Sequence, residues 1–373
     1  MLRRRTLVSA TALALPWVAR AEPGVSDQEV VFGQTGILSG PLGGQINVML
    51  AGAELAFAEA ARSGGVAGRR VRLKSLDDEL QPDRAVANVR KLLDEDGVFA
   101  LFGCVGSATT AATAALAQKA GVPMVAGYAV ADSVRTKAEG TAYFVRATSG
   151  REAEALVQHL TTIGITRIAA AVLDNPGGQE ALALIGSAMA KLNLQPAGSA
   201  AFKGDGSTVA AGARALVDAK PQAILMYLGG ALPGELMKAC WALGAQPSFY
   251  GMSIVAGEVT AKVAGERARG LAISQVVPYP WAQADPLIVR YRSGAEAAKV
   301  PVGYYSFEGY LAGLVLLEAL RRAGRDLTRD KLHAAMRGLR TRLAGMSLDF
   351  TAGNTGSRFV ELVQVSHDGR FVR

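Results

Sequence analysis

The sequence predicts an α/β fold with two lobes, each built on a parallel sheet, between which the chain crosses three times. Short apolar runs alternate with helical stretches, a pattern typical of parallel sheets that helices cover on both faces. The alternation starts again at about Arg151, which indicates two units of similar size. No low-complexity linker separates the units, and this favours two lobes that face each other.

The first unit alternates strands and helices from residue 29 onward. Strands are expected at residues 29–35, 71–78, 98–104 and 122–128, and helices at residues 44–62, 82–97 and 108–120. The second of these helices has Pro82 in its first turn and Gly97 at its end. Proline is favoured at helix starts and glycine at helix ends, so both bounds of this helix are marked in the sequence.

The second unit repeats the pattern and then changes. Helices at 152–164, 178–192, 206–219, 233–243 and 258–264 alternate with strands at 167–174, 199–202, 223–228, 249–253 and 270–277. Three helices then follow in succession, at 285–298, 304–323 and 328–338, before strands at 347–350 and 359–365. This late change of pattern indicates that the chain returns to elements of both units.

Three short segments are candidates for the crossings between lobes, at residues 147–149, 276–279 and 346–351. The predicted first lobe is therefore residues 27–147 plus 277–348, and the second is residues 148–276 plus 349–373. Ligands of open α/β sheets bind beyond the carboxyl ends of the strands. Two such units facing each other would enclose a binding cleft.

Residues 1–21 have the layout of a secretory signal. Arginines at 3–5 precede an apolar run over 7–18, and Ala19-Arg20-Ala21 forms an A-x-A cleavage site. The paired arginines also fit a twin-arginine signal, so Sec and Tat export both remain open. We expect cleavage after about Ala21 and a periplasmic protein, since no later stretch reaches the ~20 uninterrupted apolar residues of a membrane span.

The formal net charge of +8 overstates how basic the exported chain would be. Four of the 40 Lys and Arg lie in residues 1–21, which leaves 36 against 32 Asp and Glu, or +4. These charges are interspersed, with no basic stripe and no interleaved aromatic residues. We therefore expect no nucleic-acid partner.

The cysteines and histidines indicate neither a disulfide framework nor a metal site. Cys104 and Cys240 lie in apolar contexts, and we expect two free, buried thiols, although an oxidising compartment would allow one bridge. His159, His333 and His367 each lack a second ligand three or four residues away. No metal and no cofactor are expected.

The stretch "FGCVGSATT", residues 102–110, leaves a buried strand through glycines and enters a helix on hydroxyl residues. Ser107 is a candidate N-cap for a helix that starts at Ala108, and Gly106 would allow a tight turn. Unpaired amides at the positive end of a helix can bind an anion such as a carboxylate. The local sequence leaves two interpretations open, an anion site and a helix cap alone.

Several segments resemble one family by their order and spacing. They are "GILSGPLG", "GGVAGRRVRLKSLDDELQPDRAVANVRKLL", "FGCVGSATTAATAALAQKAGVPMVAGYA", "YLGGALPGELMKACWALG", "FYGMS" and "YYSFEGYLAGLVLLEAL". Over residues 28–373 the chain resembles the periplasmic leucine/isoleucine/valine-binding proteins, the solute-binding components of ABC importers. The resemblance implies a type I periplasmic-binding fold, in which two Rossmann-like lobes close like a flytrap about a hinge of three crossings.

The resemblance also implies where the ligand binds. In the family, the serine in the position of Ser107 receives the ligand carboxylate, together with the backbone that follows the next strand, here Gly127-Tyr128-Ala129. The first loop matches at Ser39-Gly40-Pro41, with Gln45 over the ligand, and Tyr305 matches an aromatic residue at the cleft edge. The candidate ligand-binding residues are Ser39, Gln45, Ser107, Ala108, Thr109, Tyr128, Ala129, Gly230, Ser253 and Tyr305.

This sequence departs from the family where the family binds the ligand ammonium. Val130 and Ser253 replace the threonine and glutamate, and a buried ammonium without a partner costs several kcal/mol. The family has a second-lobe tyrosine in a "D-x-x-x-Y-G" loop, which this chain lacks in "DNPGGQE". The family's other second-lobe tyrosine, which follows "GG", is replaced by Ala231. Two ligand classes remain open: an amino acid, and a carboxylate without an ammonium, which would be aromatic in view of Tyr128 and Tyr305. Asp174 and Glu308 would supply a negative charge only in a shifted pose, and the other interpretation is a solvated loop acid and a structural helix acid. The family's first-lobe disulfide positions carry Leu80 and Gly106.

The expected function is the monomeric receptor of an ABC importer, with a small carboxylate ligand and permease subunits as partners. A periplasmic sensor of the same fold is an alternative. A serine hydrolase is a distant one: "GMSIV" approaches the nucleophile elbow and His367 lies near the C-terminus, as in a hydrolase, but Val255 stands where the elbow needs glycine and Ser253 also matches the binding-protein family. The sequence has no dinucleotide fingerprint and no phosphate loop. We therefore expect a binding protein and not an enzyme.

Overall fold

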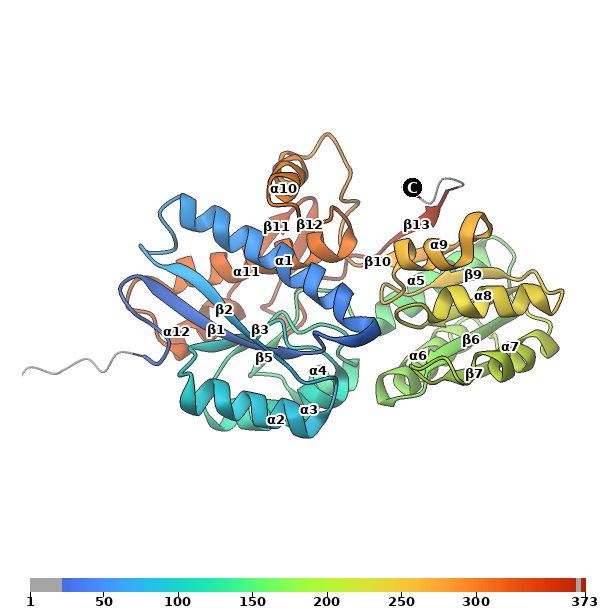
Figure 1. Ribbon diagram of the computed structural model, residues 1–373, viewed down its shortest axis with the longest axis horizontal. Helices are drawn as coiled ribbons and strands as arrows, with labels where there is room; N and C mark the ends of the chain where they lie inside the picture. The colour runs from blue at the N-terminus through green and yellow to red at the C-terminus, as the bar shows by residue number, and fades with distance from the viewer. Residues whose placement is uncertain (1–21, 367–369) are drawn as a thin grey trace, which may run out of the picture.

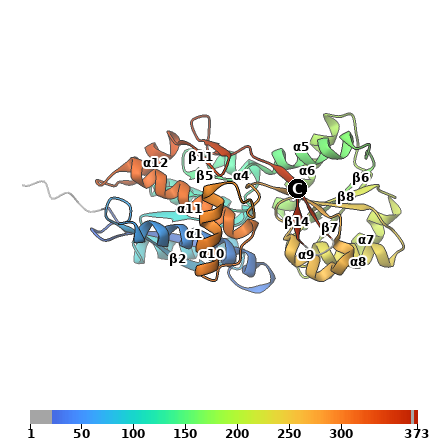
Figure 2. The same ribbon diagram turned by 90° about the horizontal axis from the view of Figure 1, so that it is seen from above.

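The computed structural model describes residues 22–366 and 370–373. Two lobes lie side by side, each with a central sheet covered by helices (Figures 1 and 2). The predicted leader, residues 1–21, and His367 lie outside the described residues. No helix in the described part of the chain is long and apolar enough to cross a membrane.

The first lobe contains a five-stranded parallel sheet of order β2-β1-β3-β4-β5. Its strands are β1 (Glu29–Gly36), β2 (Arg70–Asp77), β3 (Ala100–Phe102), β4 (Met124–Val125) and β5 (Ala142–Tyr143). Its helices are α1 (Gly40–Arg62), α2 (Pro82–Arg90) with its π-helical continuation η1 (Lys91–Glu95), α3 (Ser107–Lys119), α4 (Asp132–Lys137), α10 (Pro286–Ala297), α11 (Tyr304–Ala323) and α12 (Arg329–Arg337). Helices α1 and α11 cover one face of the sheet, and α2 and α3 cover the other (Figure 1).

The second lobe contains a seven-stranded sheet of order β14-β13-β10-β9-β8-β6-β7. Its strands are β6 (Ile168–Leu173), β7 (Gly198–Phe202), β8 (Ala223–Tyr227), β9 (Ser248–Gly251), β10 (Ala272–Gln275), β13 (Glu361–Val365) and β14 (Phe371–Val372). The strands from β6 to β10 are parallel, and β13 and β14 add an antiparallel edge. Its helices are α5 (Ser149–Thr162), α6 (Pro176–Ala190), α7 (Val209–Asp218), α8 (Leu232–Ala242), α9 (Gly257–Ala264) and η2 (Gly265–Ala268).

The predicted fold class is confirmed. The chain passes from one lobe to the other between β5 and α5, between β10 and α10, and between β12 and β13. A separate hairpin, β11 (Arg340–Leu343) and β12 (Met346–Asp349), precedes the last passage. These passages lie at or beside the three segments expected to cross, while the exact lobe boundaries stay a prediction.

The expected helices and strands are present, and the elements that the sequence missed are short. They are α4, β5, β11 and β14, which are too short to show a period. The strand expected at 122–128 is shortened to β4 because Ala126 and Ala129 have positive φ angles, of 60° and 52°, which end the extended backbone. This departure turns residues 126–129 into a loop beside α3.

Both cysteines are free and buried, as expected. Burial raises the pKa of the Cys104 thiol to about 11, so this thiol stays protonated at neutral pH. Cys104 packs in the core of the first lobe.

Glycines allow α1 and α11 to pack with their backbones in contact. A Cβ at Gly309 would lie 1.8 Å from the carbonyl oxygen of Met49, and a Cβ at Gly52 would lie 1.8 Å from that of Ser306. Neither site has room for a methyl group. This close pair fixes the position of α11, whose first turns also reach the region between the lobes.

We predict that Gly309→Ala lowers the free energy of unfolding by roughly 1–3 kcal/mol, because the new methyl forces the two helices apart. Urea denaturation monitored by circular dichroism measures this loss. Gly44→Ala is the matched control, since a Cβ there meets nothing within 4 Å and alanine favours the helix. Equal stabilities of the two variants would contradict the packing argument.

Candidate ligand-binding site

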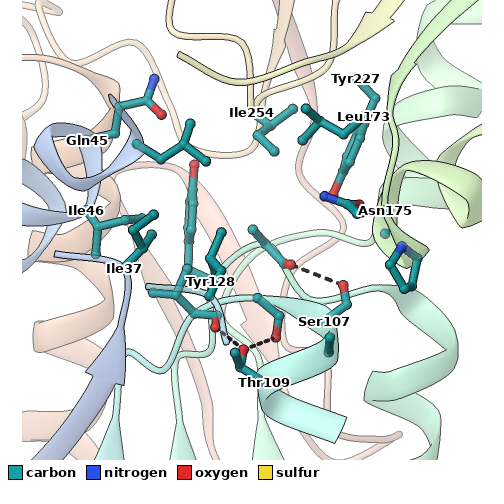
Figure 3. A pocket seen from close by; sticks show the side chains of 18 residues that line it. Ile37, Gln45, Ile46, Ser107, Thr109, Tyr128, Leu173, Asn175, Tyr227 and Ile254 are labelled. Carbon is teal, nitrogen blue, oxygen red and sulfur yellow. Dashed lines mark hydrogen bonds between the residues drawn. The ribbon is translucent and has the colours of Figure 1, made fainter. Parts of the chain in front are cut away.

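A cavity of about 230 Å³ lies between the lobes, at the carboxyl ends of strands from both sheets. The first lobe lines it with Ile37, Leu42, Gln45, Ile46, Leu80, Val105, Gly106, Ser107, Ala108, Thr109, Tyr128 and Ala129, and the second with Leu173, Asn175, Pro176, Gly177, Tyr227 and Ile254. Figure 3 shows the two sets facing each other. None of these described residues carries a formal charge, so the cavity is neutral and mainly apolar.

Helix α3 begins one residue earlier than the sequence suggested. Gly106 precedes the helix with a φ of 95°, and Ser107 is its first helical residue, without a capping hydrogen bond to α3. The prediction of Ser107 as N-cap was therefore wrong, because the left-handed backbone that starts the turn falls on glycine. The Ser107 hydroxyl instead accepts the N–H of Ala131 at 2.9 Å and donates to the carbonyl of Ala129 at 3.3 Å.

The first turn of α3 faces the cavity with amides that have no acceptor within the helix. Ser107, Ala108 and Thr109 provide these N–H groups and all line the cavity, whereas the amide of Thr110 already binds the carbonyl of Gly106. The Thr109 hydroxyl donates to the carbonyls of Val105 and Gly106, so it serves the local backbone. The positive end of the α3 dipole is thus exposed to the cavity.

Two polar atoms on the first-lobe wall have no hydrogen-bond partner among the described residues. They are the hydroxyl of Tyr128 and Nε2 of Gln45, and both atoms are buried. The Tyr128 ring is 4% exposed, lies 6.2 Å from the ring of Tyr305, and burial raises its pKa. This wall therefore presents mainly apolar surface to the cavity, because both polar atoms are buried within the wall.

The structure brings six of the ten candidate residues to the cavity, namely Gln45, Ser107, Ala108, Thr109, Tyr128 and Ala129. The other four lie outside its lining. Ser39 is exposed before α1, and Gly230 is buried before α8. Tyr305 and Ser253 lie behind the cavity, where the Tyr305 hydroxyl donates to the carbonyl of Ile254 at 3.0 Å.

A buried ion network with Arg146 at its centre lies behind Tyr128. Its guanidinium lies 3.6 Å from the carboxylate of Glu152 on α5 and 3.4 Å from that of Glu308 on α11, so it binds one carboxylate from each lobe. Arg146 also donates to the Ser253 hydroxyl and stacks 4.7 Å from the centre of the Tyr128 ring. Burial alone would lower the pKa of Arg146, but the two carboxylates outweigh it and the pKa is raised.

The structure shows where the two acids lie that the sequence offered as sources of negative charge, Asp174 and Glu308. Glu308 is paired with Arg146, and burial raises its pKa, so its charge is not directed at a ligand. Asp174 is exposed and does not line the cavity. Neither acid gives the cavity a negative group, and Ser253 uses its hydroxyl on Glu152 at 2.9 Å.

Sequence reasoning missed the second-lobe wall and Arg146. Leu173, Asn175 and Tyr227 follow or end strands β6 and β8, and the rule that ligands bind at carboxyl strand ends would have found them. Asn175 caps α6 by accepting the N–H of Gly178 at 2.9 Å. Arg146 had no such signal, because its partners are distant in the sequence.

Two α/β lobes that enclose a neutral cavity at their facing strand ends define a solute-binding protein of the type that serves ABC transporters. The model of the periplasmic binding protein family matches residues 29–370, and the chain belongs to this family. It is a binding protein and not an enzyme. The resemblance seen in the sequence is thereby confirmed.

Relatives agree with this assignment. The chain is similar to the Leu/Ile/Val-binding protein of Escherichia coli K12, with 26% identity over 291 residues, or 76% of each chain. An extracellular ligand-binding receptor from Verminephrobacter eiseniae superposes with a TM-score of 0.86 at 25% identity, over 92% of this chain and 100% of that one. A periplasmic substrate-binding protein from Ralstonia solanacearum superposes with a TM-score of 0.85 at 27% identity, over 92% of this chain and 99% of that one.

Two more distant structures share the fold and hold different ligands. A branched-chain amino acid ABC transporter protein from Thermus thermophilus contains valine, with a TM-score of 0.82 at 17% identity over 93% of this chain and 96% of that one. A solute-binding protein from R. palustris contains 4-hydroxybenzoate, with a TM-score of 0.80 at 17% identity over 93% and 95%. At this identity the likeness concerns the fold alone.

We predict that Arg146→Gln lowers the free energy of unfolding by about 3–5 kcal/mol, because it leaves two buried carboxylates without their cation. Urea denaturation at neutral pH measures the change. Arg290→Gln is the control: Arg290 lies 3.6 Å from Glu59, but its side chain is 56% exposed, and such pairs contribute about 0–1 kcal/mol. Similar small losses in both variants would show that the network does not support the fold.

Proposed function

We propose that this protein is the periplasmic receptor of an ABC importer for a small organic acid that has an apolar body and no ammonium group. The observation that carries this proposal is the cavity between the lobes, whose lining combines the open N-terminus of α3 with no charged side chain. Such a site favours one negative group on an apolar molecule.

The carboxylate of the ligand is assigned to the start of α3. Unpaired amides and the helix dipole stabilise an anion at this end of a helix. The Ser107 hydroxyl lies at the same point, and its bond to Ala129 is long at 3.3 Å, so its proton can turn toward a stronger acceptor. These groups replace the hydration of the carboxylate without a cationic side chain.

The body of the ligand is assigned to the apolar walls. Ile37, Ile46 and Leu80 line the cavity from the first lobe, and Leu173 and Ile254 from the second. The volume of about 230 Å³ exceeds the roughly 150 Å³ of an engineered cavity that holds benzene. A ring or a branched chain with a carboxylate therefore fits.

An α-amino acid fits this lining less well. Its ammonium would leave water for a cavity that has no carboxylate, and an unpaired buried cation is strongly disfavoured. Val130 and Ser253, at the family positions for ammonium binding, do not line the cavity. Since distant members of the fold hold either valine or 4-hydroxybenzoate, the choice rests on the residues of this chain.

Transport follows from closure of the lobes about their three connections. A ligand that touches both walls binds the closed form better than the open one and so shifts the population toward it. The closed surface is what the permease subunits would recognise. The signal sequence of residues 1–21 would deliver the protein to the periplasm, where this binding takes place.

Matched pairs of ligands test the absence of an ammonium site. We predict that 4-methylpentanoate and 3-phenylpropanoate raise the melting temperature of the protein, whereas leucine and phenylalanine, which differ from them by the ammonium, do not. Thermal-shift measurements followed by calorimetry give the comparison. Tighter binding of leucine than of 4-methylpentanoate would overturn the proposed ligand class.

The carboxylate site is tested at Ser107. We predict that Ser107→Ala weakens binding of the tightest carboxylate of the panel by about 1.5–3 kcal/mol, the value of a hydrogen bond to a charged group. Thr113→Val, which removes a buried hydroxyl from the same helix outside the cavity, should leave the affinity unchanged in calorimetry. Unchanged affinity in Ser107→Ala would restrict Ser107 to its bonds with residues 129–131.

A further inference from the structure

Tyr227, the last residue of β8, presents a hydroxyl to the cavity from the second lobe. Its side chain is 7% exposed and lines the cavity. The hydroxyl has no hydrogen-bond partner in the part of the chain that the structure describes. The hydroxyl oxygen is not fully buried, so it is accessible to a ligand in the cavity.

The position of Tyr227 relative to Ser107 is fixed by Gly177. A Cβ built on Gly177 would lie 3.2 Å from the Ser107 hydroxyl oxygen and 3.8 Å from the Tyr227 hydroxyl oxygen. The two hydroxyls, one from each lobe, therefore flank the same backbone position. Figure 3 shows the Tyr227 hydroxyl beside Asn175, directed toward the side of the cavity where Ser107 lies.

The start of α6 adds a second positive helix end at this point. Pro176 has no N–H, and the amide of Gly178 is bound to the side chain of Asn175. The amide of Gly177 has no acceptor within the helix, and Gly177 is one of the residues that line the cavity. Helices α3 and α6 thus direct their N-termini at one corner from opposite lobes.

The Tyr227 hydroxyl is suited to donate. Burial raises its pKa to about 12, so it keeps its proton at neutral pH. Tyr227 also provides a tyrosine hydroxyl in the second lobe, where the family's tyrosine after "GG" is replaced by Ala231 in this chain. A donor of this kind complements a carboxylate oxygen.

We propose that the ligand carboxylate is held by both lobes at once, by Ser107 and the α3 amides on one side and by the Tyr227 hydroxyl and the Gly177 amide on the other. The carboxylate itself then joins the lobes, and Tyr227 makes the closed form selective for an acid. This inference rests on the proposed function, because it assigns the second half of the same anion site.

The test compares two variants that each lose one hydroxyl from the second-lobe sheet. Tyr227→Phe alters the cavity, whereas Tyr250→Phe alters a buried tyrosine on the adjacent strand β9 that packs against His159 and does not line the cavity. Calorimetry uses 3-phenylpropanoate or 4-methylpentanoate, whichever the wild-type protein binds more tightly, and the corresponding neutral amide.

Tyr227→Phe should weaken binding of the carboxylate roughly tenfold or more, and that of the amide much less, because the lost bond is to a charge. Tyr250→Phe should change neither. Small-angle scattering at equal ligand saturation should show less compaction for Tyr227→Phe than for the wild-type protein. This measurement reports closure of the lobes, which would not change if Tyr227 had only a structural role.

The outcomes separate the two levels of the argument. If Ser107→Ala weakens carboxylate binding and Tyr227→Phe behaves like Tyr250→Phe, the carboxylate is held by the first lobe alone and this inference is wrong. An equal loss for carboxylate and amide would also overturn it. If the wild-type protein binds no carboxylate of the panel, the proposed function and this inference fail together.

Discussion

The buried guanidinium of Arg146 is the constraint on which the region between the lobes depends. Such a charge is costly away from water unless close counter-charges compensate it, and these are Glu152 from one lobe and Glu308 from the other. The connection that carries Arg146 is held in turn by Arg135, which donates to the carbonyls of Arg146 and Ala147 at 3.1 and 3.2 Å. The crossing next to the cleft is thus fixed by electrostatics as well as by packing.

The same network determines which charges a ligand can meet. Both carboxylates near the cleft are committed to Arg146, and the ring of Tyr128 lies between that cation and the cavity. The cavity itself is left with apolar side chains, hydroxyls and backbone amides. A negative ligand group then finds helix ends, while a positive one finds no partner. Under the proposed function, the ligand class would therefore be set partly by residues that do not touch the ligand.

The sequence predicted the fold because period and turn residues are local signals, and Pro82 and Gly97 mark their helix as expected. It placed Ser107 at the cavity but assigned the helix cap to the wrong residue, since the backbone angle of Gly106 depends on how the turn packs. Tyr227 ends strand β8, so the rule of carboxyl strand ends would have indicated it. Arg146 acquires its role only when segments distant in the sequence meet, and a single sequence does not show which distant residues will be in contact.

Closure brings two positive helix ends together, and this has an energetic consequence under the two-sided carboxylate site. Each end favours an anion by about 0.3–1 kcal/mol, and more when partly buried, so without an anion α3 and α6 oppose their own approach. A bound carboxylate between them makes the electrostatic contribution of both helix ends to closure favourable. A shift of a few kcal/mol is enough to change the dominant conformation of a two-state protein. The negative charge of the ligand would then be both the feature recognised and the cause of closure.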